Sequence, residues 1–194
     1  MVTCPERTDK RRTILGDTQR RWLLDGLDRS QARWNVLAQQ VVVADLDVHP
    51  GPGRSWGSDA WDGYVGDRDR ILRFLWERQP ANPLVLTGDV HSYFVNDLHL
   101  PGPRADAPVV ATELVGTSIS SAAGSYQAFR KHLKDNPHVR FFDNRWRGYL
   151  RCTIIRQRWH ADLRALSTAE RQGAPMRTLA SFVVEDGRPG AVRA

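Results

Sequence analysis

The pattern of apolar and polar positions divides the chain into helices and strands. Apolar side chains at helical spacing predict amphipathic helices over residues 16–29 and 65–79. Continuous apolar or β-branched runs predict buried strands over residues 34–44, 84–88 and 109–115. Because helix and strand alternate in this part of the chain, the pattern predicts a layered α/β arrangement that contains parallel strands.

The second half of the chain is mainly β. Residues 93–98 alternate as in a half-buried strand, residues 125–134 suggest a short basic helix, and residues 141–147 have no regular period. Further strands are predicted over residues 150–155, 159–165 and 179–184. The predicted fold class is therefore α/β, with mixed sheets that combine parallel and antiparallel pairs.

Composition and charge exclude only some classes of protein. A length of 194 residues suits one ordinary domain or part of a larger one, and seven tryptophans indicate a buried core. No apolar run is long enough to span a bilayer, and none follows Arg11-Arg12 or Arg20-Arg21, so no signal peptide or transmembrane segment is visible. Cys4 and Cys152 form no metal-binding motif. The net charge of +6 is spread along the chain, so no nucleic-acid partner is expected, whereas an anionic phosphoester suits it.

The most informative stretch is the buried run 84–88, which ends in Gly88 and is followed by Asp89 and His91. Residues just past the carboxyl end of a buried strand point into the crevice where α/β proteins bind ligands. A carboxylate oxygen and an imidazole nitrogen placed there can bind one metal ion. The alternative is a solvated strand end without chemistry. On the metal-binding interpretation, Asp89 and His91 face one shared cleft.

A second Asp-x-His motif, formed by Asp47 and His49, follows the predicted strand that ends near residue 44. Prolines and glycines follow it over residues 50–53 and would hold the two side chains loosely. We therefore interpret this motif as a solvated loop, with a metal site as the secondary possibility.

Two further clusters are candidates for lining a site. Trp61, Asp62 and Tyr64 either support the cleft or simply pack a loop, with Asp62 as the cap of the following helix. Thr117 and Ser118 belong to a loop of small residues that could bind phosphate oxygens through hydroxyl and amide groups, although it lacks the glycine spacing of a P-loop.

Taken together, seven short motifs resemble those of the alkaline phosphatase D (PhoD-like) family of metallophosphatases. In chain order they are Leu15-Gly16 with Gln19 and Trp22-Leu23, Trp34 to Gln40, Trp61 to Tyr64, Leu86 to Ser92, Glu113 to Ser121, Arg147 to Tyr149, and Glu185 to Gly190. They occur in the order of the family and at plausible spacing, so the match is specific.

The resemblance implies a four-layer α/β/β/α metallophosphatase sandwich that hydrolyses phosphomonoesters and phosphodiesters. It also implies a site with Fe³⁺ and Ca²⁺, in which Asp89 and His91 are metal ligands and therefore catalytic residues. In such a site a metal-activated water attacks phosphorus in line. Members of the family are often exported; the location of this chain stays open.

Members of the family carry an amino-terminal half that supplies a cysteine, an aspartate, a tyrosine and an asparagine as further ligands. This chain starts too late to contain it. We therefore expect a mobile lead-in over residues 1–13, the carboxy-terminal portion of the phosphatase domain over 14–190 and a tail over 191–194, with an incomplete metal site. The missing half is a possible partner in trans. The alternative function is a non-catalytic remnant or binding module of the same fold.

Overall fold

The computed structural model describes residues 4–48, 53, 55–102 and 106–194. The helical elements are η1 (Pro5–Thr8), α1 (Gly16–Asp28), η2 (Trp61–Gly63), α2 (Val65–Arg78), α3 (Tyr126–Arg130) and η3 (Leu133–Asp135). The strands are β1 (Asn35–Ala38), β2 (Pro83–Thr87), β3 (Tyr93–His99), β4 (Val109–Val115), β5 (Val139–Asp143), β6 (Arg147–Ile154), β7 (Arg158–Leu166), β8 (Met176–Glu185) and β9 (Val192–Arg193).

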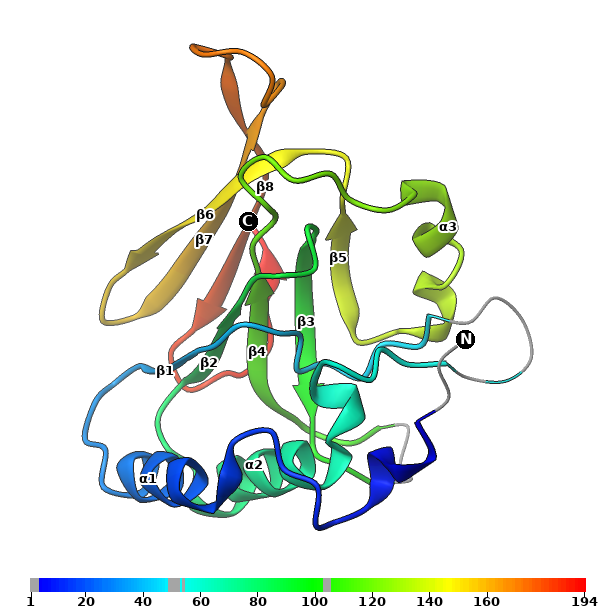
Figure 1. Ribbon diagram of the computed structural model, residues 1–194. Helices are drawn as coiled ribbons and strands as arrows, with labels where there is room; N and C mark the ends of the chain where they lie inside the picture. Colours follow the sequence, from blue (N-terminus) through cyan, green and yellow to red (C-terminus); the bar gives the residue numbers. More distant parts are fainter. Residues whose placement is uncertain (1–3, 49–52, 54, 103–105) are drawn as a thin grey trace.

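The strands form two sheets (Figure 1). The first, which we call the mixed sheet, has the order β1-β2-β4-β3-β5. Its first three strands are parallel, with Val36 opposite Leu84 and Leu84 opposite Thr112, whereas β3 runs antiparallel to both β4 and β5. The second, the antiparallel sheet, has the order β6-β7-β8-β9. Mixed α/β architecture with both kinds of strand pair is therefore confirmed.

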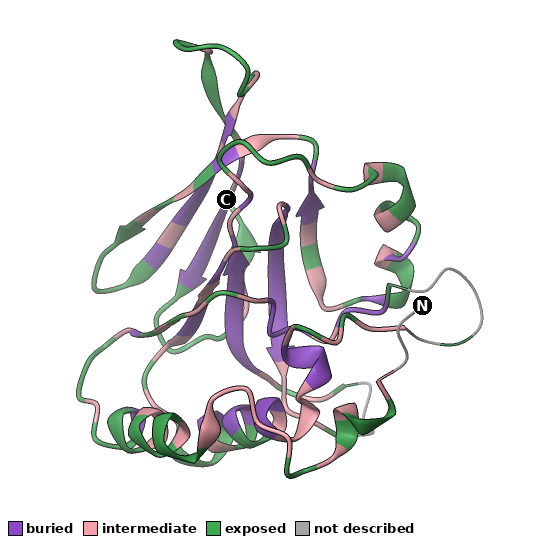
Figure 2. Cartoon of the chain, viewed as in Figure 1, coloured by how far each residue is buried: buried purple, intermediate pink, exposed green. Residues whose placement is uncertain are grey.

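The mixed sheet lies between two apolar cores (Figure 2). Alternate residues of β2 show this directly, because Val85 packs on the helical side and Leu84 packs towards the antiparallel sheet. All three α-helices contribute side chains to the helical core. The described residues thus form helix, sheet and sheet layers, and among them no helix covers the outer face of the antiparallel sheet.

The elements with the strongest local pattern match their predictions closely. The helices predicted over 16–29 and 65–79 are α1 and α2, and the buried runs 84–88 and 109–115 are β2 and β4. Helix α2 ends at Arg78, and the following residue, Gln79, adopts the left-handed conformation and donates its amide to the Leu75 carbonyl.

The predicted strand over 34–44 is wrong beyond residue 38. Strand β1 covers Asn35–Ala38 only, and the chain then leaves the sheet. Gln39 and Gln40 still form backbone bonds with Leu86 and Gly88, but further along the amides of Val43 and Ala44 donate instead to the two oxygens of Glu113, at 2.8 and 3.1 Å. Since these amides are already satisfied, they form no ladder with a neighbouring strand.

Three other predictions of strand structure need correction. Strand β5 (Val139–Asp143) overlaps the stretch 141–147 that was predicted to be irregular, and it forms because it pairs with β3 at the edge of the mixed sheet. Strand β3 is buried on both faces rather than half-buried, since a core lies on each side of it. The short strand β9 and the extension of β8 back to Met176 were not predicted; both arise from pairing within the antiparallel sheet.

The sequence also offers Asp17-Thr18 as a cap for the first helix, and this prediction is wrong. Asp17 and Thr18 lie inside the helix, and the Gly16 amide donates instead to the Thr13 hydroxyl at 2.8 Å. Trp22, predicted to face the core, leaves 72% of its surface exposed, whereas Leu27 is buried. The helix therefore packs through a narrower apolar stripe than its sequence indicates.

Residues 4–13, which composition assigns to a mobile lead-in, contact the segment around η2 and the start of α2. Arg7 Nε donates to the Asp62 carbonyl at 2.8 Å, and Arg12 lies over the Tyr64 ring at 4.7 Å. The Thr13 hydroxyl donates to Asp67. The domain boundaries stay predictions. In the described part of the chain, no helix combines the length and the apolar character needed to cross a membrane.

Candidate functional site

The carboxyl ends of the parallel strands meet at one edge of the mixed sheet. The Gly88 amide donates to the Gln40 carbonyl at 3.1 Å, which joins the segments after β2 and β1. The Gly116 amide donates to the Thr87 carbonyl at 2.9 Å, which joins the segment after β4 to the end of β2. Figure 1 shows the connection from β2 to β3 and the loop after β4 at this same edge. Ligands of open α/β sheets bind at such carboxyl edges.

Asp89 and His91 lie in the turn between β2 and β3, and both have left-handed backbones, with φ of 64° and 53°. Asp89 is exposed and His91 is half-buried. A non-glycine residue with positive φ is uncommon, and such conformations concentrate at functional sites. The turn itself is closed by a hydrogen bond of 2.8 Å from the Val90 amide to the Gly88 carbonyl. The backbone thus holds both candidate ligands in one tight turn.

The protonation of the His91 ring follows from its partner. Nδ1 lies 2.7 Å from the carbonyl oxygen of Ala122. Because a carbonyl oxygen only accepts hydrogen bonds, Nδ1 carries the proton, and in the neutral ring Nε2 holds the free lone pair. A histidine that binds a metal commonly donates its other ring N–H to a carbonyl in this way. Nε2 is therefore the nitrogen through which His91 can act.

The loop of small residues after β4 is tied down rather than free. The Thr117 hydroxyl donates to the Trp146 carbonyl at 3.0 Å. The Ser118 hydroxyl donates to the Ser121 carbonyl and accepts from Arg147, both at 2.6 Å. These hydroxyl groups are committed to the protein, so the expectation that Thr117 and Ser118 line a phosphate site now depends on the backbone of this loop.

A buried acidic side chain, Glu113 in β4, connects several of the segments that meet near this edge. It is fully buried and accepts from four groups: the Val43 and Ala44 amides, the Thr87 hydroxyl and the Asn96 amide group. Burial raises its pKa, and these four donors oppose that shift. Glu113 thereby joins β4, β2 and β3 to the segment that follows β1.

Trp61 is linked to the same edge by hydrogen bonds, and its role in lining or supporting a cleft there stays a prediction. Its indole N–H donates to Gln39 Oε1 at 3.0 Å, and Gln39 Nε2 donates to the Thr87 hydroxyl at 2.7 Å. Thr87 donates in turn to Glu113 at 2.7 Å. Trp61 therefore reaches the end of β2 through one intervening side chain.

Asp62 and Tyr64 have different surroundings. The buried Asp62 accepts from the Leu46 amide at 3.1 Å and from Arg68 at 2.5 Å. It does not cap α2, which has no side-chain cap, so that prediction is wrong: the carboxylate turns to the arginine one turn into the helix. Burial raises the pKa of Asp62 to about 7, against the opposing effect of Arg68. Tyr64 lies beneath Arg12.

In the second Asp-x-His motif, Asp47 is among the residues that the structure describes, whereas His49 lies outside them. Asp47 is buried and its side chain accepts from the Ser55 amide at 3.1 Å. Its backbone exchanges two hydrogen bonds of 2.9 Å with the side chain of Asn136. These contacts anchor the segment after β1, so a ligand role for Asp47 and His49 stays a secondary prediction.

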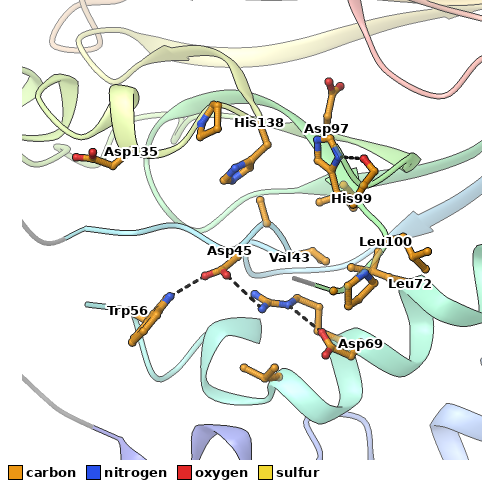
Figure 3. Close-up of a pocket in the computed structure, with 18 of the residues that line it drawn as sticks. Val43, Asp45, Trp56, Asp69, Leu72, Asp97, His99, Leu100, Asp135 and His138 are labelled. Carbon is orange, nitrogen blue, oxygen red and sulfur yellow. Dashed lines mark hydrogen bonds and ion pairs between the residues drawn. The ribbon is translucent and has the colours of Figure 1, made fainter. Parts of the chain in front are cut away.

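A cavity of about 660 Å³ lies elsewhere, beside the start of α2, the end of β3 and the start of β5 (Figure 3). Several of its charged side chains are paired within the protein: Asp45 accepts from Trp56 at 2.7 Å and lies 3.8 Å from Arg68, which also approaches Asp69 at 4.0 Å. A second cavity, of about 400 Å³, lies near the end of α2. Neither cavity is lined by Asp89 or His91. That these two residues face a shared cleft therefore stays a prediction.

The side chains at this turn are of types that bind metal ions, but they are too few to complete a metal site. A carboxylate and an imidazole with one fixed nitrogen are ordinary ligands. Within the described ranges, however, no group of three or more His, Cys, Asp or Glu side chains is arranged to hold a metal ion. Even a structural zinc takes four ligands. Asp89 and His91 alone do not form a complete multinuclear site.

Three residues that support this edge, Gln39, Glu113 and Arg147, were not singled out from the sequence as site residues. Glu113 had a usable signal, because a carboxylate in the middle of an apolar strand needs buried partners. Arg147 had only its place at the start of a short family motif, since arginines are frequent throughout the chain.

Comparison with known proteins agrees with this architecture. Residues 1–163 match the sequence profile of the family described as PhoD-like phosphatase. Alkaline phosphatase D of Bacillus subtilis (strain 168) is 38% identical over 188 residues, which are 95% of this chain and 32% of that protein. A solved structure described as the structure of PhoD superposes with a TM-score of 0.87 at 33% identity, over 99% of this chain and 37% of that one. The chain thus spans about a third of the length of these relatives. It belongs to the PhoD-like phosphatase family.

Proposed function

We propose that this chain provides part of the active site of a phosphoester hydrolase, with Asp89 and His91 as its catalytic, metal-binding residues. The observation that carries the proposal is the tight turn at the carboxyl edge of the mixed sheet, where His91 Nδ1 is held by the Ala122 carbonyl and Nε2 remains available. The family and the Bacillus subtilis relative support phosphoester chemistry.

The substrate class is phosphomonoesters and phosphodiesters, and the metals are Ca²⁺ and Fe³⁺, as the family resemblance implies. Such cations, when bound, polarise the phosphoryl oxygens and lower the pKa of a bound water. The chain's own contribution is the carboxylate of Asp89, the Nε2 atom of His91 and the rigid loop behind that ring. The remaining ligands are then contributed by other residues, and an amino-terminal half bound in trans is one source.

The alternative is a non-catalytic binding module of the same fold. The incomplete set of donors favours it. On this alternative, the strained turn at Asp89 and His91 has no catalytic use.

The test places this segment in a complete phosphatase. Residues 15–190 replace the corresponding part of Bacillus subtilis alkaline phosphatase D, and hydrolysis of bis-nitrophenyl phosphate is measured with Ca²⁺ and Fe³⁺ supplied. We expect turnover in this chimera that is lost in the Asp89→Asn/His91→Ala double variant and kept in Asp25→Asn, an exposed position on α1. The isolated chain should show little or no turnover, since catalysis depends on stabilising charge at a complete site.

Two results would contradict the proposal. A folded chimera without turnover supports the binding-module alternative. Full turnover in the Asp89→Asn/His91→Ala variant removes both residues from the chemistry and redirects attention to Asp47 and His49.

A further inference from the structure

Two segments far apart in the chain are joined beside His91. The loop formed by residues 117–122 follows β4, and residues 144–148 connect β5 to β6. Thr117 donates to the Trp146 carbonyl at 3.0 Å, and the Gly148 amide donates to the Ser118 carbonyl at 3.1 Å. Ala122, at the end of the loop, provides the carbonyl that binds His91. The position of that carbonyl therefore depends on how firmly the two segments are joined.

Arg147 makes most of the side-chain bonds between them. Its Nη1 donates to the Ser118 hydroxyl at 2.6 Å and to the Ser121 carbonyl, and its Nη2 donates to the Asn144 carbonyl. All three oxygens that accept hydrogen bonds from Arg147 are neutral. Among the described residues, no carboxylate lies within ion-pair distance of its guanidinium. A guanidinium can serve several acceptors at once because its donors point in fixed, divergent directions.

We propose that Arg147 is a positioning residue that fixes the tautomer of His91 through the 117–122 loop. By holding Ser118 and Ser121, it keeps the Ala122 carbonyl against Nδ1, and so leaves the lone pair on Nε2. The proposal rests on the proposed function of His91 for its relevance to hydrolysis, but the tautomer itself is a property of the folded chain.

A purely structural role for Arg147 predicts something different. In that case its loss lowers the stability of the whole domain and leaves the His91 ring unchanged in the molecules that remain folded. A positioning role predicts a local change in the loop and in the ring, at temperatures where the domain stays folded. The two roles are therefore separable without measuring activity.

The main variant is Arg147→Met, which keeps an unbranched apolar stem and removes every donor. Its matched control is Arg145→Met, two residues away, whose guanidinium binds Asp143 and lies over Tyr126 but has no recorded contact with the loop. Both variants remove one positive charge. If Arg147→Met does not fold, Ser118→Ala removes the hydroxyl that Arg147 binds and serves in its place.

The first measurement is ¹⁵N NMR of the histidine rings in the labelled chain at neutral or mildly alkaline pH. In the unmodified chain and in Arg145→Met, we expect His91 as the Nδ1–H tautomer. In Arg147→Met, and to a smaller degree in Ser118→Ala, we expect both tautomers. The second measurement is hydrogen exchange of the Gly148 amide, which should become about tenfold faster in Arg147→Met because charged hydrogen bonds that hold its acceptor are lost.

An unchanged His91 tautomer in folded Arg147→Met would overturn the proposal, whatever the exchange rate. An equal change in Arg145→Met would overturn it too, because the effect would then follow from lost charge. If the tautomer shifts as expected but the Asp89→Asn/His91→Ala chimera keeps full turnover, the positioning role stands and the proposed function fails.

Discussion

The Thr87 hydroxyl, at the end of β2, donates a 2.7 Å hydrogen bond to the fully buried carboxylate of Glu113 in β4. This bond connects the strand that leads into the turn of Asp89 and His91 to the carboxyl group that also binds the segment after β1. Strands β2 and β4 are therefore joined at this edge through an acidic side chain that lies away from solvent.

Glu113→Gln should destabilise the domain. Its carboxylate accepts from four donors, and an amide would turn an NH₂ group towards two of them. We expect a loss of about 1–3 kcal/mol in the free energy of unfolding, the cost of leaving buried groups unsatisfied. Urea unfolding at neutral pH measures it, with Glu185→Gln at an exposed position as the control. Equal unfolding midpoints for the two variants would show that the hydrogen bonds of Glu113 do not stabilise the domain.

Gly148→Ala should be far more damaging than a typical glycine substitution. Gly148 has φ of 155°, and a Cβ there would lie 1.8 Å from the Arg164 carbonyl oxygen and 2.6 Å from the Tyr93 hydroxyl, which bond to each other. We expect a loss above about 3 kcal/mol, since the backbone has to move to relieve the overlap. Gly124→Ala is the control, because nothing lies near its Cβ. Thermal unfolding compares them; similar midpoints would contradict the packing described.

Asp62 should make stability fall as pH rises. Its pKa of about 7 in the folded protein exceeds the ordinary 3.8, so between these values the folded state binds a proton that the unfolded state has released. Since stability falls with pH wherever the folded state binds more protons, its contribution is lost as pH rises from about 4 to about 7. The pKa difference corresponds to at most about 4 kcal/mol.

Unfolding free energies of the unmodified chain and Asp62→Asn, measured across this pH range, test the prediction. The variant should show a smaller decrease with rising pH, whereas the control Asp59→Asn, at an exposed position, should follow the unmodified chain. Parallel curves for Asp62→Asn and the unmodified chain would contradict it.

Asp67 should act in the opposite direction. Its buried carboxylate accepts from Thr13, from the Ile14 amide at 3.0 Å and from Arg20 at 2.8 Å. Although burial opposes the change, these donors lower its pKa. Its contribution is therefore present above the ordinary value near 3.8 and is lost as pH falls below it.

Asp67→Asn removes the charge that joins the start of the chain and α1 to α2. We expect a loss of about 1–3 kcal/mol at neutral pH, because the Thr13, Ile14 and Arg20 donors lose their charged buried acceptor while Arg20 keeps Asp17. Limited proteolysis should cleave near residues 10–13 faster than in the unmodified chain, and Asp17→Asn, an exposed partner of Arg20, should not have this effect. Unchanged cleavage would show that other contacts hold the segment.

The backbone conformation of Asp89 should lower the stability of the fold, although its side chain is a candidate metal ligand. Asp89 is exposed, with φ of 64°, a region that glycine adopts more easily. Asp89→Gly should change the free energy of unfolding by between zero and about +1 kcal/mol, while removing the candidate ligand. Gln79→Gly, at φ of 49° on the end of α2, is a positive control for relief of this conformation. A clear loss of stability in Asp89→Gly would reveal a stabilising contact of the carboxylate.

The sequence by itself determined the elements whose signal is local. Helical spacing was enough for α1 and α2, and uninterrupted apolar runs were enough for β2 and β4, because burial of one face or of a whole strand requires those patterns. It also placed Asp89 and His91 just past a buried strand, and its motifs indicated the family that the comparisons show.

Only the tertiary structure decided the features that depend on partners distant in the chain. The predicted strand does not extend over Val43 and Ala44, whose amides donate to Glu113, about seventy residues away. The ring of His91 is oriented by Ala122, on a loop that Arg147 holds from another connection. A residue's local pattern records whether it is buried, but not which distant group satisfies its hydrogen bonds, and at this edge of the sheet those partners define the candidate site.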